Sequence, residues 1–62
     1  MSLAKKRKAK GYTLHKLADL SGVNYVKIHK IEHGKIKAEH IMLRTALKLA
    51  KALECAPEEL LD

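Results

Sequence analysis

The sequence of 62 residues has a single cysteine, Cys55, so it cannot form an intrachain disulfide. A lone cysteine is consistent with a reducing cytosol, and its apolar neighbours favour a small core or boundary side chain over a nucleophile. No apolar run approaches the roughly 18 residues that a membrane span needs. The basic N-terminal segment is not followed by the apolar run of a signal peptide. We therefore expect one small cytoplasmic domain over residues 1–62.

The sequence also lacks the motifs of the common enzymes: it has no phosphate-binding loop, no Ser/His/Asp set and no paired catalytic carboxylates. His29 and His33 are four residues apart and can share a helix face. However, zinc normally takes three or four ligands, and the run from His29 to His33 differs from the metalloprotease motif. We therefore expect that the protein is not an enzyme and that it binds no metal, no cofactor and no small-molecule ligand.

Acidic residues are scarce in the first 37 positions, where ten Lys and Arg stand against Asp19 and Glu32, a net charge of +8. Residues 38–62 carry three basic and five acidic residues, a net charge of −2. This asymmetry indicates one side that faces an anion, either nucleic acid or an acidic membrane surface.

The stretch from Thr13 to Gly34 predicts two short helices joined by a tight turn. Thr13 and Asn24 are suitable N-caps, and Gly22 can end the first helix because glycine tolerates the left-handed conformation. The first helix has an apolar stripe of Leu14, Leu17, Ala18 and Leu20. Small and apolar residues would form the core of the motif and let the two helices approach: Leu17, Ala18, Gly22, Val23, Ile28 and Ile31. This pattern is typical of a helix-turn-helix at about 13–33, and the basic outer face disfavours an ordinary helical hairpin.

Three further helices are expected around this motif, which makes the domain all-α with five helices. A basic helix at 3–9 has Leu3 inward, and a short last helix has Pro57 in its first turn. Leu60 and Leu61 would close the core or form a dimer contact. Between them lies a longer helix whose predicted inward face is Leu43, Ala46, Leu47, Ala50 and Leu53.

Several short segments between Leu3 and Asp62 together form a specific signature: Arg7, Gly11-Tyr12-Thr13, Leu17-Ala18, Ser21-Gly22-Val23, Ile28, Ile31-Glu32-His33-Gly34-Lys35, Leu49-Ala50-Lys51-Ala52-Leu53 and Glu59-Leu60-Leu61. In these segments the chain resembles the DNA-binding domain of the lambda and 434 repressor and Cro family of phage and bacterial regulators. The resemblance implies a compact lambda-repressor-like domain that binds double-stranded DNA at the nucleoid. It would act as a transcriptional regulator, most simply a repressor.

The resemblance also implies a structural ion pair between Arg7 and Glu32. Glu32 lies near a helix C-terminus, where the macrodipole disfavours an acid, and a bidentate arginine would offset that effect. We expect Glu32→Ala to lower the melting temperature far more than Glu39→Ala.

DNA contacts follow from the same resemblance. The positions of Tyr25, Val26 and Lys30 make most base-edge contacts in the family, with Lys27 next, and His29 lies on the same outer face. Lys30 can reach guanine O6 and N7, and Val26 a thymine methyl. For Tyr25 the alternative is a surface aromatic that shields the turn. Candidate phosphate contacts come from polar and basic residues around the motif: Thr13, Asn24, His33, Lys35 and Lys37.

The chain departs from the family pattern at two places. Leu14 stands where many relatives have a glutamine that contacts phosphate and braces the recognition helix. Either that part of the phosphate contact is weaker here, with the backbone donors of the helix start retained, or Leu14 packs against Tyr25 or Val26 instead. The interval from Gly34 to Leu49 is about three residues longer than usual, so either the loop is longer or the fourth helix begins near Ala38.

A chain of this size contacts one half-site, so we expect a weak homodimer, or a dimer formed on DNA, at a pseudo-palindromic operator. The contact would involve the Leu60-Leu61 end or the surface near the fourth helix. Two other functions remain open. One is a protein-interaction module such as an antitoxin. The other is a membrane-surface peptide, with Arg44, Lys48 and Lys51 opposite an apolar face.

Overall fold

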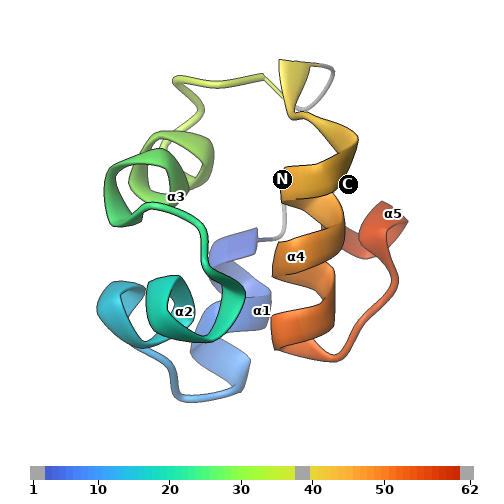
Figure 1. Cartoon of the computed structure of the whole chain (residues 1–62). Helices are drawn as coiled ribbons and strands as arrows, with labels where there is room; N and C mark the ends of the chain where they lie inside the picture. Colours follow the sequence, from blue (N-terminus) through green and yellow to red (C-terminus); the bar gives the residue numbers. More distant parts are fainter. Residues whose placement is uncertain (1–2, 38–39, 61–62) are drawn as a thin grey trace.

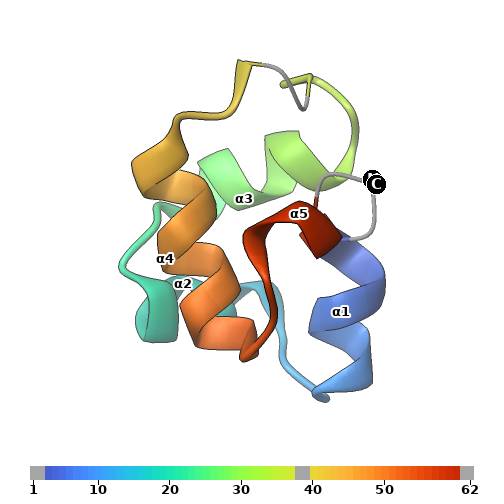
Figure 2. The ribbon, with the colours of Figure 1, turned by 90° about the vertical axis from the view of Figure 1, so that its right-hand side faces the viewer.

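The computed structural model describes residues 3–37 and 40–60. Within these ranges the chain has five helices and no strand: α1 (Leu3–Ala9), α2 (Leu14–Ser21), α3 (Tyr25–Glu32), α4 (Leu43–Leu53) and α5 (Pro57–Leu60). The expected all-α, five-helix fold is confirmed. α2 and α3 lie along one side, α4 runs along the other, and α1 lies behind them (Figure 1). The short α5 lies between α4 and α1 (Figure 2).

Both predicted N-caps of the helix-turn-helix are confirmed. The Thr13 hydroxyl accepts a hydrogen bond from the Lys16 amide at 3.0 Å, and Asn24 Oδ1 accepts one from the Val26 amide at 2.7 Å. Gly22 ends α2 with φ at +76°, and its amide donates to the Ala18 carbonyl at 2.9 Å. These three local signals fix the residue at which α2 ends and the residue at which α3 begins.

Of the two roles expected for Gly22, the left-handed end of α2 is confirmed, but the close approach of the two helices at this residue is not. Gly22 is exposed, and a Cβ atom built on it would meet nothing within 4 Å. The glycine is therefore needed for its positive φ and not for close packing of the two helices. Ala18 is half-buried and packs against the core.

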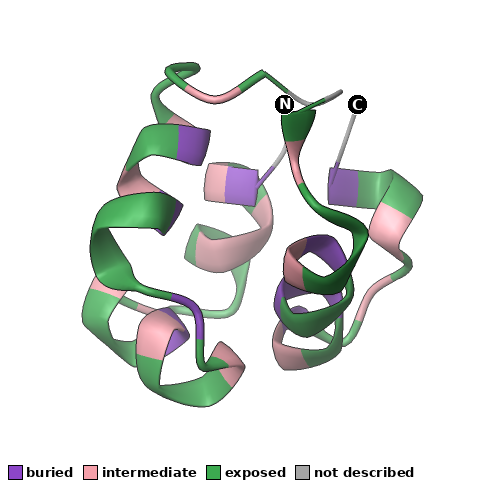
Figure 3. Ribbon diagram, turned by 45° about the horizontal axis from the view of Figure 1, so that its top comes forward, coloured by how far each residue is buried: buried purple, intermediate pink, exposed green. Residues whose placement is uncertain are grey.

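The core is a single cluster to which every helix contributes. Figure 3 shows buried residues on each of the helices. The buried members of the cluster are Leu3, Leu17, Val23, Ile28, Ile31, Leu49, Ala50, Leu53 and Leu60. Cys55 is half-buried against this cluster, and burial raises the pKa of its thiol. Leu60 is buried in this cluster, which confirms the expectation that it closes the core. Leu61 lies outside the described residues.

The predicted inward face of α4 was partly wrong. Leu43 and Leu47 are 71% and 48% exposed, whereas Leu49 is buried. Because each helical residue turns about 100°, a face centred on Ala46, Leu49 and Leu53 leaves Leu43 and Leu47 on the flank. The result is an exposed apolar strip on α4 next to Met42, which is 63% exposed.

The apolar stripe expected on α2 also needs correction, because Leu20 is 48% exposed while Leu17 is fully buried. The inward face of α4 is occupied by the core, so it is not free to lie on a membrane as the surface-peptide alternative requires. The longest described helix has 11 residues, and no helix in the described ranges has the length and apolarity to cross a bilayer.

The extra residues after Gly34 lengthen the loop and not the fourth helix. α4 begins at Leu43 and not near Ala38, which lies with Glu39 outside the described residues. The loop starts by folding back on α3, since the Lys35 amide donates to the Lys30 carbonyl at 2.9 Å. Ile36 and Ile41 then anchor the two sides of the loop on the core.

Candidate nucleic-acid interface

The fixed orientation of α3 defines an outer face. Ile28 and Ile31 are 0% and 2% exposed and point to the core. Val26 and Lys30 lie on the opposite side because of the 100° turn per residue, and both are exposed. The centre of the outer face is thus an apolar side chain beside a cationic one.

The other three residues expected to face bases occupy the flanks of this face. Tyr25, 38% exposed, lies on the α2 side, where it contacts His15. Lys27 is exposed on the α4 side. His29 is half-buried and not exposed, and its ring centroid lies 4.2 Å from the ring centroid of His33. The structure therefore brings all five side chains to one surface but does not present them equally.

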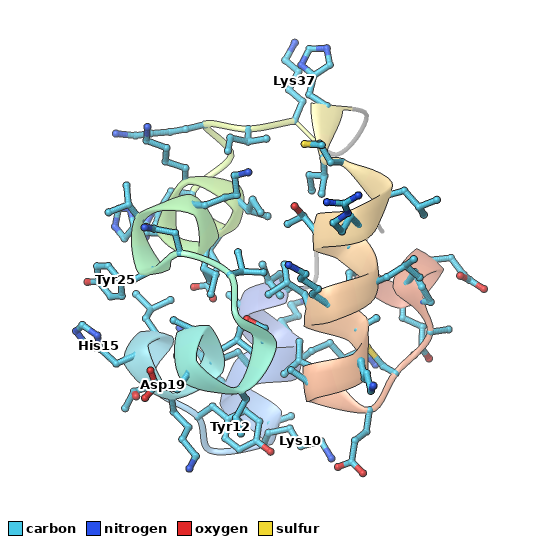
Figure 4. The ribbon with its side chains drawn as sticks, in the orientation of Figure 1. Lys10, Tyr12, His15, Asp19, Tyr25 and Lys37 are labelled. Atoms are coloured by element: carbon cyan, nitrogen blue, oxygen red, sulfur yellow. The ribbon has the colours of Figure 1, made fainter. Side chains whose placement is uncertain are left out.

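His15 also belongs to this surface, although its sequence pattern did not indicate it. Its imidazole stacks on the Tyr25 ring with centroids 4.4 Å apart and an angle of 12° between the planes. Both side chains project outward from the start of their helices (Figure 4). Leu14, the neighbour expected to contact Tyr25 or Val26, packs against the core. The sequence gives no signal for this stack, because it depends on how α2 and α3 are oriented relative to each other.

The candidate phosphate contacts surround the outer face. Thr13 and Asn24 are exposed at the starts of α2 and α3, where backbone amides and the helix dipole favour an anion. His33 and Lys35 follow the end of α3 and are exposed. Lys37 lies far along the loop, at the upper end of the molecule in Figure 4.

Two cations from α4 join this surface. Arg44 and Lys48 line a shallow cavity together with Asn24 and Lys27, and no acidic residue contributes to its lining. From the sequence, Arg44 and Lys48 were expected only on the polar side of a membrane-surface helix. Their position next to Asn24 and Lys27 could not be predicted, because it depends on how α4 packs near the start of α3.

The only acid of α3, Glu32, is turned away from this surface towards α1. Its Oε2 accepts a hydrogen bond from Arg7 Nε at 2.7 Å, and its Oε1 accepts one from Arg7 Nη2 at 3.1 Å. Arg7 Nη1 also donates to the Tyr12 carbonyl at 2.8 Å. The hydrogen bond to Glu32 is the main reason why the pKa of Arg7 is raised. The expected ion pair is thus present, and it removes a negative charge from the outer face.

The rings of His29 and His33 are adjacent, with their centroids 4.2 Å apart. Within residues 3–37 and 40–60, no three His, Cys, Asp or Glu side chains are grouped so as to hold a metal ion. The geometry of this surface is therefore that of a cationic helix face with flanking helix N-termini.

A family model for the Cro/C1-type HTH DNA-binding domain matches residues 2–62. Neither a curated protein nor a solved structure matches the chain.

Proposed function

The chain belongs to the Cro/C1-type family of helix-turn-helix DNA-binding domains, and from this premise we propose that it is a sequence-specific repressor that reads an operator half-site with α3. One observation carries the proposal. Val26 and Lys30 are exposed at the centre of the outer face, while the only acid of the helix is sequestered by Arg7. A helix can approach a polyanion closely when its exposed face carries cations and no carboxylate.

Base reading is assigned to α3. Lys30 donates to guanine O6 and N7, and Val26 packs against a thymine methyl. Tyr25 and His29 reach base edges on the α2 side of the helix, and Lys27 does so on the α4 side. Lys27 also lines the cavity that Arg44 lines, so it can contact either a phosphate or a base edge.

Phosphate binding is assigned to the residues that frame the outer face. They hold the domain in register on the duplex without reading sequence. The set comprises Thr13, Asn24, His33, Lys35 and Lys37. We add Arg44 and Lys48 to it, because they line a cavity together with Asn24.

Repression follows if the protein occupies an operator that overlaps a promoter. One domain reads one half-site, so two copies would bind a pseudo-palindromic operator about one helical turn apart. Because Leu60 is buried, the exposed strip of Met42, Leu43 and Leu47 is the better candidate for the contact between copies. The same strip is the feature that favours the second candidate, an antitoxin-like module that binds a protein partner.

Selection of bound duplexes from a random pool at two salt concentrations tests the proposal. We expect a defined half-site and an affinity that falls steeply with salt, because each neutralised phosphate contributes about −0.9 to the logarithmic slope. Lys30→Ala should relax the preference at one base pair at a cost of about 1–3 kcal/mol. The matched variant Lys37→Ala should weaken all sequences alike. A pool that yields no preferred sequence, or uniform losses in both variants, contradicts the assignment.

A further inference from the structure

The stacked pair of His15 and Tyr25 joins α2 to α3 at the edge of the outer face. The rings are nearly parallel and in contact, and neither residue belongs to the buried core cluster. Figure 4 shows both rings at the periphery, on the same side of the molecule. An aromatic contact between two exposed side chains orders them without adding to the core.

The contact restricts the side chain of Tyr25. Tyr25 is the first residue of α3, and its side chain can adopt several staggered rotamers when nothing holds it. An imidazole stacked on one face of the ring favours one of these rotamers before a ligand arrives. The hydroxyl is then held at a defined position on the α2 side of the outer face.

We propose that His15 is a positioning residue for DNA recognition, which by stacking on Tyr25 fixes the base pair that the tyrosine reads. This inference rests on the proposed function of α3. Ordering a free side chain on binding lowers affinity, and a ring that is already ordered avoids much of that loss. Loss of the stack should weaken binding to the preferred sequence by about two- to tenfold. The loss should fall mainly on one base pair.

A purely electrostatic role for His15 makes a different prediction. An imidazole that only contacts phosphate contributes equally to every sequence, since phosphate contacts carry no sequence information. The two roles are therefore distinguished by how the loss of His15 changes the base preference, and not by how it changes the overall affinity.

Selection from the random duplex pool distinguishes them. His15→Ala and Tyr25→Ala should flatten the preference at the same base pair. The double variant should lose no more than Tyr25→Ala alone, because His15 acts through Tyr25. His15→Phe keeps a ring that can stack and should restore the preference. His40→Ala, which removes an exposed histidine from the loop, should keep the full wild-type preference.

Proton NMR of the DNA-free protein tests the stack itself. The ring protons of His15 should be shifted upfield by Tyr25 and should lose that shift in Tyr25→Ala. Absence of the shift overturns the inference, as does a uniform loss across sequences in His15→Ala or additive losses in the double variant. If the shift is present but the wild-type protein selects no sequence, the proposed function itself has failed.

Discussion

Breaking the Arg7–Glu32 ion pair should cost a large part of the stability of the domain. The two side chains are only 13% and 5% exposed, and Arg7 makes three hydrogen bonds that join α1, α3 and the loop before α2. Removing Glu32 leaves a poorly solvated guanidinium without its partner. Loss of one member of a buried pair costs about 3–5 kcal/mol.

That loss is large on the scale of this chain. At about 0.05–0.15 kcal/mol per residue, a domain of this length has a total stability of roughly 3–9 kcal/mol. Glu32→Ala should therefore lower the melting temperature by more than about 12 °C, since 1 kcal/mol corresponds to about 4–8 °C in a domain of this size. The control is Glu54→Ala, because Glu54 is 73% exposed and its partner Lys10 is also solvent-accessible.

Thermal and urea denaturation followed by circular dichroism at 222 nm measures both changes. Replacing both partners by apolar residues, Arg7→Met with Glu32→Leu, should cost less than the sum of the single changes, because no unpaired charge remains. If Glu32→Ala costs no more than Glu54→Ala, or if the two single losses simply add, the pair does not have the structural role described.

Three further predictions follow from burial and charge. Leu49→Ala should cost about 2–5 kcal/mol in denaturation, and Leu47→Ala much less; equal losses would contradict the burial of α4. The pKa of Glu54 is lowered chiefly by the hydrogen bond from Lys10, so the pair stabilises the fold above the ordinary carboxyl pKa and loses that effect as the pH falls through the lowered pKa. The melting-temperature difference between wild type and Glu54→Gln should shrink in that acidic range, whereas a constant difference would refute it. Because burial raises the pKa of the Cys55 thiol, a disulfide reagent at neutral pH should react more slowly with the native protein than with the protein in urea; equal rates would show that the thiol is open.

Local chemistry accounts for the features that were predictable from the sequence. Each cap joins residues only two or three positions apart, Asn24 to Val26 and Thr13 to Lys16, and the positive φ of Gly22 depends on the glycine itself. The helix-turn-helix could therefore be placed before the structure was known. The ion pair of Arg7 and Glu32 joins residues 25 positions apart, and it was expected from the family resemblance together with the unfavourable place of an acid near a helix C-terminus.

Long-range geometry accounts for the features that were missed. The segment of α4 has leucines at positions 43, 47, 49 and 53, and apolar spacing alone leaves the rotation of the helix about its axis undetermined. Packing against α2 and α5 selects the face with Leu49. The stack of His15 on Tyr25 likewise depends on the angle between α2 and α3, which no local pattern specifies.

The central claim is that the outer face of α3 enters the major groove. Its most direct test is ¹⁵N–¹H chemical-shift mapping of the protein with the duplex that the selection yields. We predict that the largest changes fall on the amides of residues 25–30 and at the start of α2, with α5 hardly affected. Changes centred on α1 and α5 with an unperturbed α3 would contradict it.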